Sequence, residues 1–189
     1  MTVEQLTKTI ETIFNPKIDF VKVRDVKSPN RATANDAGTD LFVPNYDKQF
    51  LEDLIKKNPD RNLHYNLDDN NVLHILIMPQ ERILIPSGVK VNIHNKWSYL
   101  KVDNKSGIAN GRGLLVGSDI VDADYRGEMH LSVINTSDTP QEIVTGMKLV
   151  QVIHSLKLDT AWNEISKADF DNLPPTERMD GGFSSTGLF

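Results

Sequence analysis

The sequence contains no cysteine, which excludes disulfide bridges, thiolate zinc sites, iron–sulfur clusters and cysteine nucleophiles. No apolar run approaches the roughly 18 residues of a membrane-spanning helix, and the first residues, MTVEQLTKTIETIF, lack the apolar stretch of an export signal. The formal net charge of −5 argues against duplex nucleic acid, which usually binds a basic face. We therefore expect a cytoplasmic (intracellular) protein, where the cytoplasm can also be that of a host cell. We expect neither membrane nor nucleic-acid partners.

Several common catalytic sequences are also missing. The chain has no GxxxxGK[ST] phosphate loop, no HExxH and no GxSxG, and its five histidines do not have metal-ligand spacing. Glycine is scarce in the first half: Gly38 is followed by ten more only from Gly88 to Gly187. Because glycine serves where the backbone takes a positive φ or approaches another group closely, we expect the functional loops in the second half.

The length of 189 residues suits one domain. Helical spacing of apolar residues predicts helices over 1–14 and 47–58, the second ended by Pro59. Alternation predicts strands over 18–26, 129–134 and 148–158, and a hairpin at Pro86-Ser87-Gly88 between strands 82–85 and 89–93. The polar segment 167–180 is expected to be an extended linker. The fold class that follows is all-β and antiparallel, with small helical additions.

Five short segments occur in a fixed order. They read Ala-Gly-Thr-Asp-Leu at 37–41, Asn-Lys-Ser-Gly-Ile-Ala at 104–109, LLVGSDIVDADYRGE at 114–128, Gly-Met-Lys-Leu-Val-Gln at 146–151, and RMDGGFSSTG at 178–187. Together they resemble the five motifs of the trimeric dUTPase family. The resemblance covers residues 18–43 and 77–189, and it implies a single dUTPase-like domain over 1–189. This domain has an N-terminal helix (1–14), an insertion (44–76) and a flexible C-terminal tail (167–189), of which the helix and the insertion fall outside the resemblance.

The resemblance implies a jelly-roll-like barrel and a dUTP diphosphatase that converts dUTP to dUMP and pyrophosphate. It also implies Mg²⁺, which binds phosphates with one or two carboxylates, and a homotrimer whose subunits share three sites. Two other functions remain open. One is a dCTP deaminase-related or bifunctional enzyme. The other is a nucleotide-gated regulatory protein that binds a protein partner through insertion 44–76, although the favoured interpretation of that insertion is a peripheral helix that covers one end of the barrel.

The third segment carries the predicted chemistry. By resemblance, Asp122 orients and activates the water that attacks the α-phosphorus, and a carboxylate ionised at neutral pH can accept the hydrogen bond of that water. Asp124 is the competing candidate for this role, and it lies on the same face as Asp122 if the strand is regular. Alternatively, both residues belong to a solvated acidic turn. By resemblance, Tyr125 packs on the sugar and leaves no room for a 2′-hydroxyl; otherwise it is a core aromatic.

Backbone groups of the turn that precedes Asp122 can distinguish uracil from cytosine, because a 4-oxo group accepts a hydrogen bond where a 4-amino group donates one. The substrate-binding residues assigned to this turn are Gly117, Asp119 and Ile120. Asp119 replaces a glycine that is common in the family.

The other segments supply phosphate contacts. A phosphate could be bound by the cation of Lys105, the hydroxyl of Ser106 and the amide of Gly107. Alternatively, these three residues form a plain turn. The family usually has arginine at Lys105, so Arg112 is a possible helper. Gln151 resembles a phosphate-contacting glutamine, or is an outward strand residue. The tail residues assigned to closing over the substrate are Arg178, Phe183, Ser184, Ser185 and Thr186. Asp40 is a candidate for contacting the metal through water, or for holding a strand or subunit contact.

Overall fold

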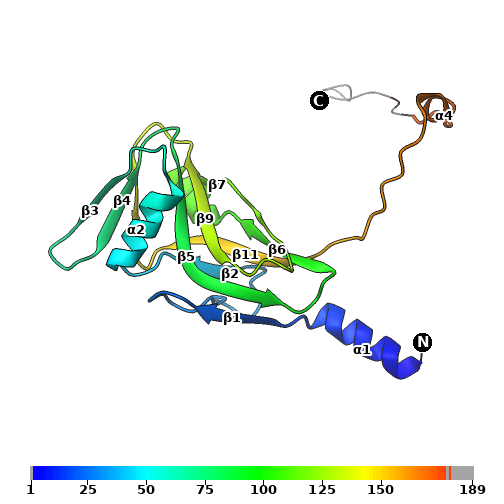
Figure 1. Ribbon diagram of the computed structural model, residues 1–189, viewed down its shortest axis with the longest axis horizontal. Helices are drawn as coiled ribbons and strands as arrows, with labels where there is room; N and C mark the ends of the chain where they lie inside the picture. Colours follow the sequence, from blue (N-terminus) through cyan, green and yellow to red (C-terminus); the bar gives the residue numbers. More distant parts are fainter. Residues whose placement is uncertain (1, 178, 180–189) are drawn as a thin grey trace. The chain divides into compact units, whose positions relative to one another are not determined.

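The computed structural model describes residues 2–177 and 179. The chain divides into two compact units, Met1–Leu158 and Asp159–Phe189. In the described residues, the first unit contains eleven strands and three helices and the second contains one short helix; most of these elements are labelled in Figure 1.

The helices are α1 (Val3–Phe14), α2 (Lys48–Lys57), α3 (Ser106–Arg112) and α4 (Lys167–Asp171). The first strands are β1 (Ile18–Lys22), β2 (Thr39–Phe42), β3 (His64–Leu67), β4 (Leu73–Ile77), β5 (Arg82–Ile93) and β6 (Ser98–Asp103). The later strands are β7 (Leu114–Val116), β8 (Ile120–Val121), β9 (Glu128–Asn135), β10 (Gln141–Val144) and β11 (Lys148–Leu156).

The strands form three sheets with the orders β1-β5-β9-β7, β2-β11-β6-β8 and β10-β4-β3. Every pairing between the named strands is antiparallel. Their inward positions carry aliphatic side chains that form a continuous core, with Ile85, Leu131, Ile143 and Val150 fully buried. Strand alternation places one face of strands such as β4 and β6 in this core, and the predicted all-β class with small helical additions is confirmed.

Local sequence signals determine the two helices that were predicted. The Thr2 side chain accepts a hydrogen bond from the Gln5 N–H, and the Gln5 side chain accepts one from the Thr2 N–H, so both form a capping box at the start of α1. The Asp47 side chain accepts from the Phe50 N–H and begins α2. Phe50 and Leu54 of α2 are fully buried, and the helix packs on β5.

The structure contradicts the predicted hairpin at residues 86–88. Strand β5 runs without interruption from Arg82 to Ile93. Its first half pairs with β9 and its second half with β1, and the register with β9 shifts between Pro86 and Lys90. Gly88 has a φ of +73° at this irregularity, a conformation that glycine adopts without strain. The turn-like sequence therefore marks a bulge in one long strand.

The extended linker predicted over residues 167–180 is also wrong in its first part. Residues Lys167–Asp171 form α4, because the Ser166 side chain accepts a hydrogen bond from the Asp169 N–H at its start. The turn predicted at residues 144–147 is confirmed, with Gly146 at a φ of +78°. It joins β10 and β11, which belong to different sheets.

The three-stranded sheet contains an ionic cluster centred on His74 of β4. The Nδ1 atom of His74 lies 2.8 Å from Glu142 on β10, and its Nε2 atom lies 3.6 Å from Asp68, which follows β3. The hydrogen bond to Glu142 raises the pKa of His74, burial opposes the increase, and Asp68 adds to it. When protonated, the imidazole forms ion pairs with both carboxylates and links β4 to β10 and to the residue that follows β3.

We expect this cluster to stabilise the protein more at pH 6 than at pH 9. Because the folded-state pKa of His74 is raised, its contribution is complete below the unfolded value of about 6.5 and disappears as the pH rises through the folded value. Thermal unfolding across this range should show that His74→Gln lowers the melting temperature at pH 6 and has little effect at pH 9. His64→Gln on β3 is the control, since the described residues give His64 no carboxylate partner. An equal effect of His74→Gln at both pH values would contradict the assignment.

Candidate active site

A small hollow of about 190 Å³ lies beside the segment predicted to carry the chemistry. Its lining includes Asp122, Tyr125, Ile120 and Ser118. The buried Val102 of β6 and Met129 of β9 form its floor together with the partly buried Leu84 of β5. Asp122 and Tyr125 are both exposed at its rim, so an apolar hollow opens to solvent beside a carboxylate.

Asp122 and Tyr125 are close because the chain turns between them. The Tyr125 N–H donates to the Asp122 carbonyl at 3.1 Å, and the Arg126 guanidinium donates to the Ala123 and Tyr125 carbonyls. Residues 122–125 are therefore a turn, and the expectation that Asp122 and Asp124 share a strand face is wrong. A turn after the two-residue strand β8 ends the alternation on which that expectation depended.

The Tyr125 ring folds back over the same turn. Its hydroxyl donates to the Glu128 carbonyl at 2.9 Å. A Cβ atom on Gly127 would overlap the Tyr125 hydroxyl, so this ring position requires glycine at residue 127. Tyr125 is exposed rather than buried in the core, which leaves its ring available to a ligand.

The turn at Gly117, Ser118 and Asp119 connects β7 and β8, as predicted. Part of its backbone is used within the protein: the Gly117 N–H donates to the Ser132 carbonyl at 2.9 Å, and the Asp119 carbonyl accepts from the Val102 N–H at 2.7 Å. A Cβ atom on Gly117 would lie 2.8 Å from Ser132 Oγ, so this backbone approaches β9 closely. Gly117, Asp119 and Ile120 are all exposed, and only Ile120 lines the hollow.

The predicted phosphate contacts lie at a separate place, where β2, β11 and α3 meet. Lys105 immediately precedes α3, and Ser106 and Gly107 are exposed in the first turn of that helix. Both oxygens of the buried Asp40 carboxylate pair with ammonium groups, one with Lys105 and the other with Lys148 at 2.9 Å. Burial alone would raise the pKa of Asp40, but these two hydrogen bonds hold the pKa below its usual value.

Through Asn104, Gln151 of β11 connects this group to the end of β7, just before the turn at Gly117, Ser118 and Asp119. Its side-chain amide donates to the Asn104 carbonyl at 2.7 Å, and the Asn104 side-chain oxygen accepts from the Val116 N–H at 2.7 Å. A Cβ atom on Gly38 would overlap the Gln151 side chain, so Gly38 leaves the space that Gln151 fills. The Arg112 guanidinium instead donates to the Glu142 carbonyl, at the opposite end of α3 from Lys105.

The predicted site residues thus form two groups in one chain. Among the described residues, those that line the hollow at Asp122 do not include Lys105, Asp40 or Gln151. The predicted tail residues Arg178, Phe183, Ser184, Ser185 and Thr186 lie outside the described residues.

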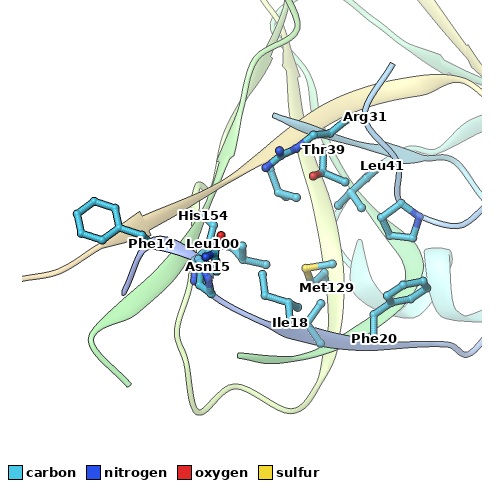
Figure 2. A pocket seen from close by; sticks show the side chains of 14 residues that line it. Phe14, Asn15, Ile18, Phe20, Arg31, Thr39, Leu41, Leu100, Met129 and His154 are labelled. Carbon is cyan, nitrogen blue, oxygen red and sulfur yellow. The ribbon is translucent and has the colours of Figure 1, made fainter. Parts of the chain in front are cut away.

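A larger cavity of about 430 Å³ lies between the two four-stranded sheets (Figure 2). Its walls are mostly apolar, with Ile18, Leu100 and Met129 facing it, and His154 contributes a polar edge. Burial lowers the pKa of His154, whose Nε2 lies 2.7 Å from Ser98 Oγ. None of the described residues predicted to act on substrate lines this cavity, so its chemistry differs from that of the proposed site.

The structure adds residues that the sequence reasoning did not find. Lys148 stands inside the fourth motif segment and could have been chosen as a second cation there. Asn104 begins the second segment, but its bridging role depends on contacts with β7 and β11. Arg24 and Glu128 form a partly buried ion pair, and no local sequence signal indicates their pairing.

Comparison with known proteins matches residues 67–187, more than half of the chain, to the dUTPase family model. A deoxyuridine 5′-triphosphate nucleotidohydrolase of Wolbachia pipientis (strain wPip) is 34% identical over 176 residues, which cover 90% of this chain and 95% of that protein. The enzyme of the same name from Candida albicans is 34% identical over 112 residues, covering 59% of this chain and 63% of that protein. The chain belongs to the dUTPase family.

Solved structures agree on the fold. A mutant dUTPase of Staphylococcus bacteriophage 80alpha with dUpNHpp superposes with a TM-score of 0.67 at 16% identity, covering 91% of this chain and 99% of that one. The native EIAV dUTPase gives a TM-score of 0.56 at 20% identity, covering 80% and 98%. The predicted jelly-roll-like dUTPase barrel is confirmed. In the described part of the chain, no helix is long and apolar enough to cross a membrane.

Proposed function

We propose that this protein is a dUTP diphosphatase, which hydrolyses dUTP to dUMP and pyrophosphate. The observation that carries the proposal is the hollow at residues 118–125, where an exposed carboxylate, an exposed tyrosine ring and an apolar floor adjoin. Family membership supplies the reaction, since the relatives from Wolbachia and Candida are named for it. A nucleoside that enters the hollow would bring its sugar beside Tyr125 and its α-phosphate beside Asp122.

In the proposed mechanism, Asp122 holds the attacking water and accepts its proton as the water oxygen bonds to the α-phosphorus. The bond from that phosphorus to the bridging oxygen breaks, and pyrophosphate leaves. An exposed aspartate is a weak base, so most of its effect comes from orienting the water. Lys105, Lys148, Ser106 and Gln151 would stabilise the charge on the phosphates. The tail residues at 178 and 183–186 would complete the site.

We propose that Mg²⁺ enters with the triphosphate. A dUTPase of phage phi11 is described with a coordinated structural Mg(II) ion. In the described part of this chain, no group of three acidic or histidine side chains is placed to hold a metal, and Lys105 and Lys148 already neutralise Asp40. Asp40 therefore does not fit a direct ligand role, and the phosphate oxygens would hold the ion, as Mg²⁺ prefers.

The separation of the two residue groups supports a homotrimer with shared sites. Lys105 and Asp122 lie in different places on one chain, so each would be completed by the other group from a neighbouring subunit. Trimers are typical of the family, and a cytoplasmic location fits a substrate drawn from the nucleotide pool. A protein partner for insertion 44–76 stays a prediction. The insertion is joined to the rest of the unit by α2, and it exposes Tyr65, Leu67 and Leu76 on its sheet.

A panel of deoxynucleoside triphosphates and UTP, with and without Mg²⁺, tests the function. We expect pyrophosphate release from dUTP with Mg²⁺, and discrimination of at least about 10²-fold against dCTP and UTP, because buried polar groups left unpaired reject the wrong ligand. The solution mass should be that of three chains. Release of ammonia from dCTP would favour the deaminase-related alternative, and tight dUTP binding without turnover would favour the regulatory one.

A further inference from the structure

One buried guanidinium connects segments that are far apart in the sequence. Arg24 Nε donates to Glu128 Oε1 at 2.7 Å, and its Nη2 donates to Glu128 Oε2 at 2.9 Å and to Asp53 Oδ2 at 2.6 Å. The Arg24 side chain is 8% exposed, against 13% for Glu128 and 29% for Asp53. A planar fork that binds one carboxylate through two atoms fixes direction as well as distance.

Glu128 is the link from this ion pair to the proposed nucleotide site. It begins β9, directly after the turn that contains Asp122 and Tyr125. Its carbonyl accepts the hydrogen bond of the Tyr125 hydroxyl, and its Oε1 also accepts from the Gly88 N–H at 2.7 Å. The carboxylate and the carbonyl of one residue therefore hold the β5 bulge, Arg24 and the Tyr125 ring together.

Helix α2 supplies the opposite end of the network. Asp53 stands on this helix, and Arg24 Cζ lies 5.8 Å from the centre of the Phe50 ring, one turn before Asp53. Burial, and after it the charge of Lys57 at the end of α2, lowers the pKa of His130, which lines the hollow. Helix α2 therefore contacts Arg24 through Asp53 and Phe50, and it influences His130 beside the proposed sugar site through Lys57.

We propose that Arg24 is a positioning residue that holds the Tyr125 turn in place, and that Asp53 makes helix α2 part of this support. The inference rests on the proposed function for its effect on substrate, because Tyr125 is the residue assigned to the sugar. It gives residues 44–76 a role in nucleotide selection. When Asp53 no longer holds the guanidinium, Arg24 and Glu128 gain freedom, and the Tyr125 ring excludes a 2′-hydroxyl less well.

The test compares two neutralised carboxylates on the same helix. Asp53→Asn removes a charge that contacts Arg24, whereas Glu52→Gln removes the neighbouring charge, which faces Lys48 at 3.8 Å. The specificity constants, kcat/KM, for dUTP and UTP are measured for both variants. Asp53→Asn should lower the ratio of dUTP to UTP constants by roughly fivefold, mainly through a lower KM for UTP, because a slightly displaced Tyr125 ring excludes the 2′-hydroxyl less well. Glu52→Gln should leave the ratio unchanged.

Hydrogen exchange without nucleotide gives a readout that does not depend on catalysis. Amides of residues 122–128 should exchange faster in Asp53→Asn than in the wild type, and at the wild-type rate in Glu52→Gln. Arg24→Lys, which keeps the charge but loses the fork, should act in the same direction as Asp53→Asn. If the wild type hydrolyses dUTP and Asp53→Asn matches Glu52→Gln in both ratio and exchange, the inference is wrong. If the wild type does not hydrolyse dUTP, the proposed function fails, and exchange alone still decides whether Asp53 supports the turn.

Discussion

Replacing Asp122 with asparagine is expected to lower the rate of pyrophosphate release from dUTP by about 10²- to 10⁴-fold, the usual contribution of a positioned acid–base group. Asparagine keeps the size of the side chain and can still hydrogen-bond a water, but it cannot accept the proton. Because Asp122 is exposed at the rim of the hollow, the variant should fold normally and bind dUTP. Turnover should therefore fall while KM changes little.

Asp124→Asn is the matched control, since it makes the same chemical change two residues away in the same turn. We expect its rate to stay within about threefold of the wild type, as for an exposed substitution outside the reaction. A nearly normal rate for Asp122→Asn with a large loss for Asp124→Asn would transfer the assigned role to Asp124.

Co-expression of two impaired chains would show whether sites are shared. If Asp122 of one subunit works with Lys105 of a neighbour, a mixture of Asp122→Asn and Lys105→Ala chains forms some sites with both residues intact. Random mixing should then restore about a quarter of the wild-type activity, since both positions of a site must receive the right chain. No recovery would place both residues of a working site on one chain.

Replacing Phe50 with alanine is expected to lower the free energy of unfolding by about 3–5 kcal/mol, because the substitution removes buried apolar contacts and leaves a cavity. The Phe50 side chain is 0% exposed and packs in the continuous core, although it belongs to the insertion outside the family resemblance. Such a loss is a large part of the 5–15 kcal/mol that holds a typical domain together. The midpoint of urea unfolding should fall with an unchanged slope.

Ile55→Ala on the same helix is the control, because Ile55 is 46% exposed. We expect it to change stability by less than about 1 kcal/mol. Both variants are compared at one protein concentration, since assembly contributes to the stability of an oligomer. Equal, small losses for the two would mean that α2 is a detachable addition to the barrel.

Part of the site could be predicted from the sequence because the motif segments are short and continuous. Asp122 and Tyr125 are three residues apart, and one turn brings both to the hollow. The phosphate group could be predicted only in part. The segment predicts Lys105, whereas its partner Asp40 is a candidate for a metal contact, because nothing local indicates that Lys105 before α3 and Lys148 of β11 neutralise that carboxylate.

By itself, the sequence determined the features that depend on neighbouring residues: the ends of α2 at Asp47 and Asn58, the turn at Gly146, and the motif segments that indicate the family. Tertiary structure alone decided that residues 82–93 form one strand, since this requires pairing with both β1 and β9. It also decided that Arg24 meets Glu128, 104 positions away. Caps and turns form by contacts within a few residues, whereas strand partners and buried ion pairs are selected by packing of the whole chain.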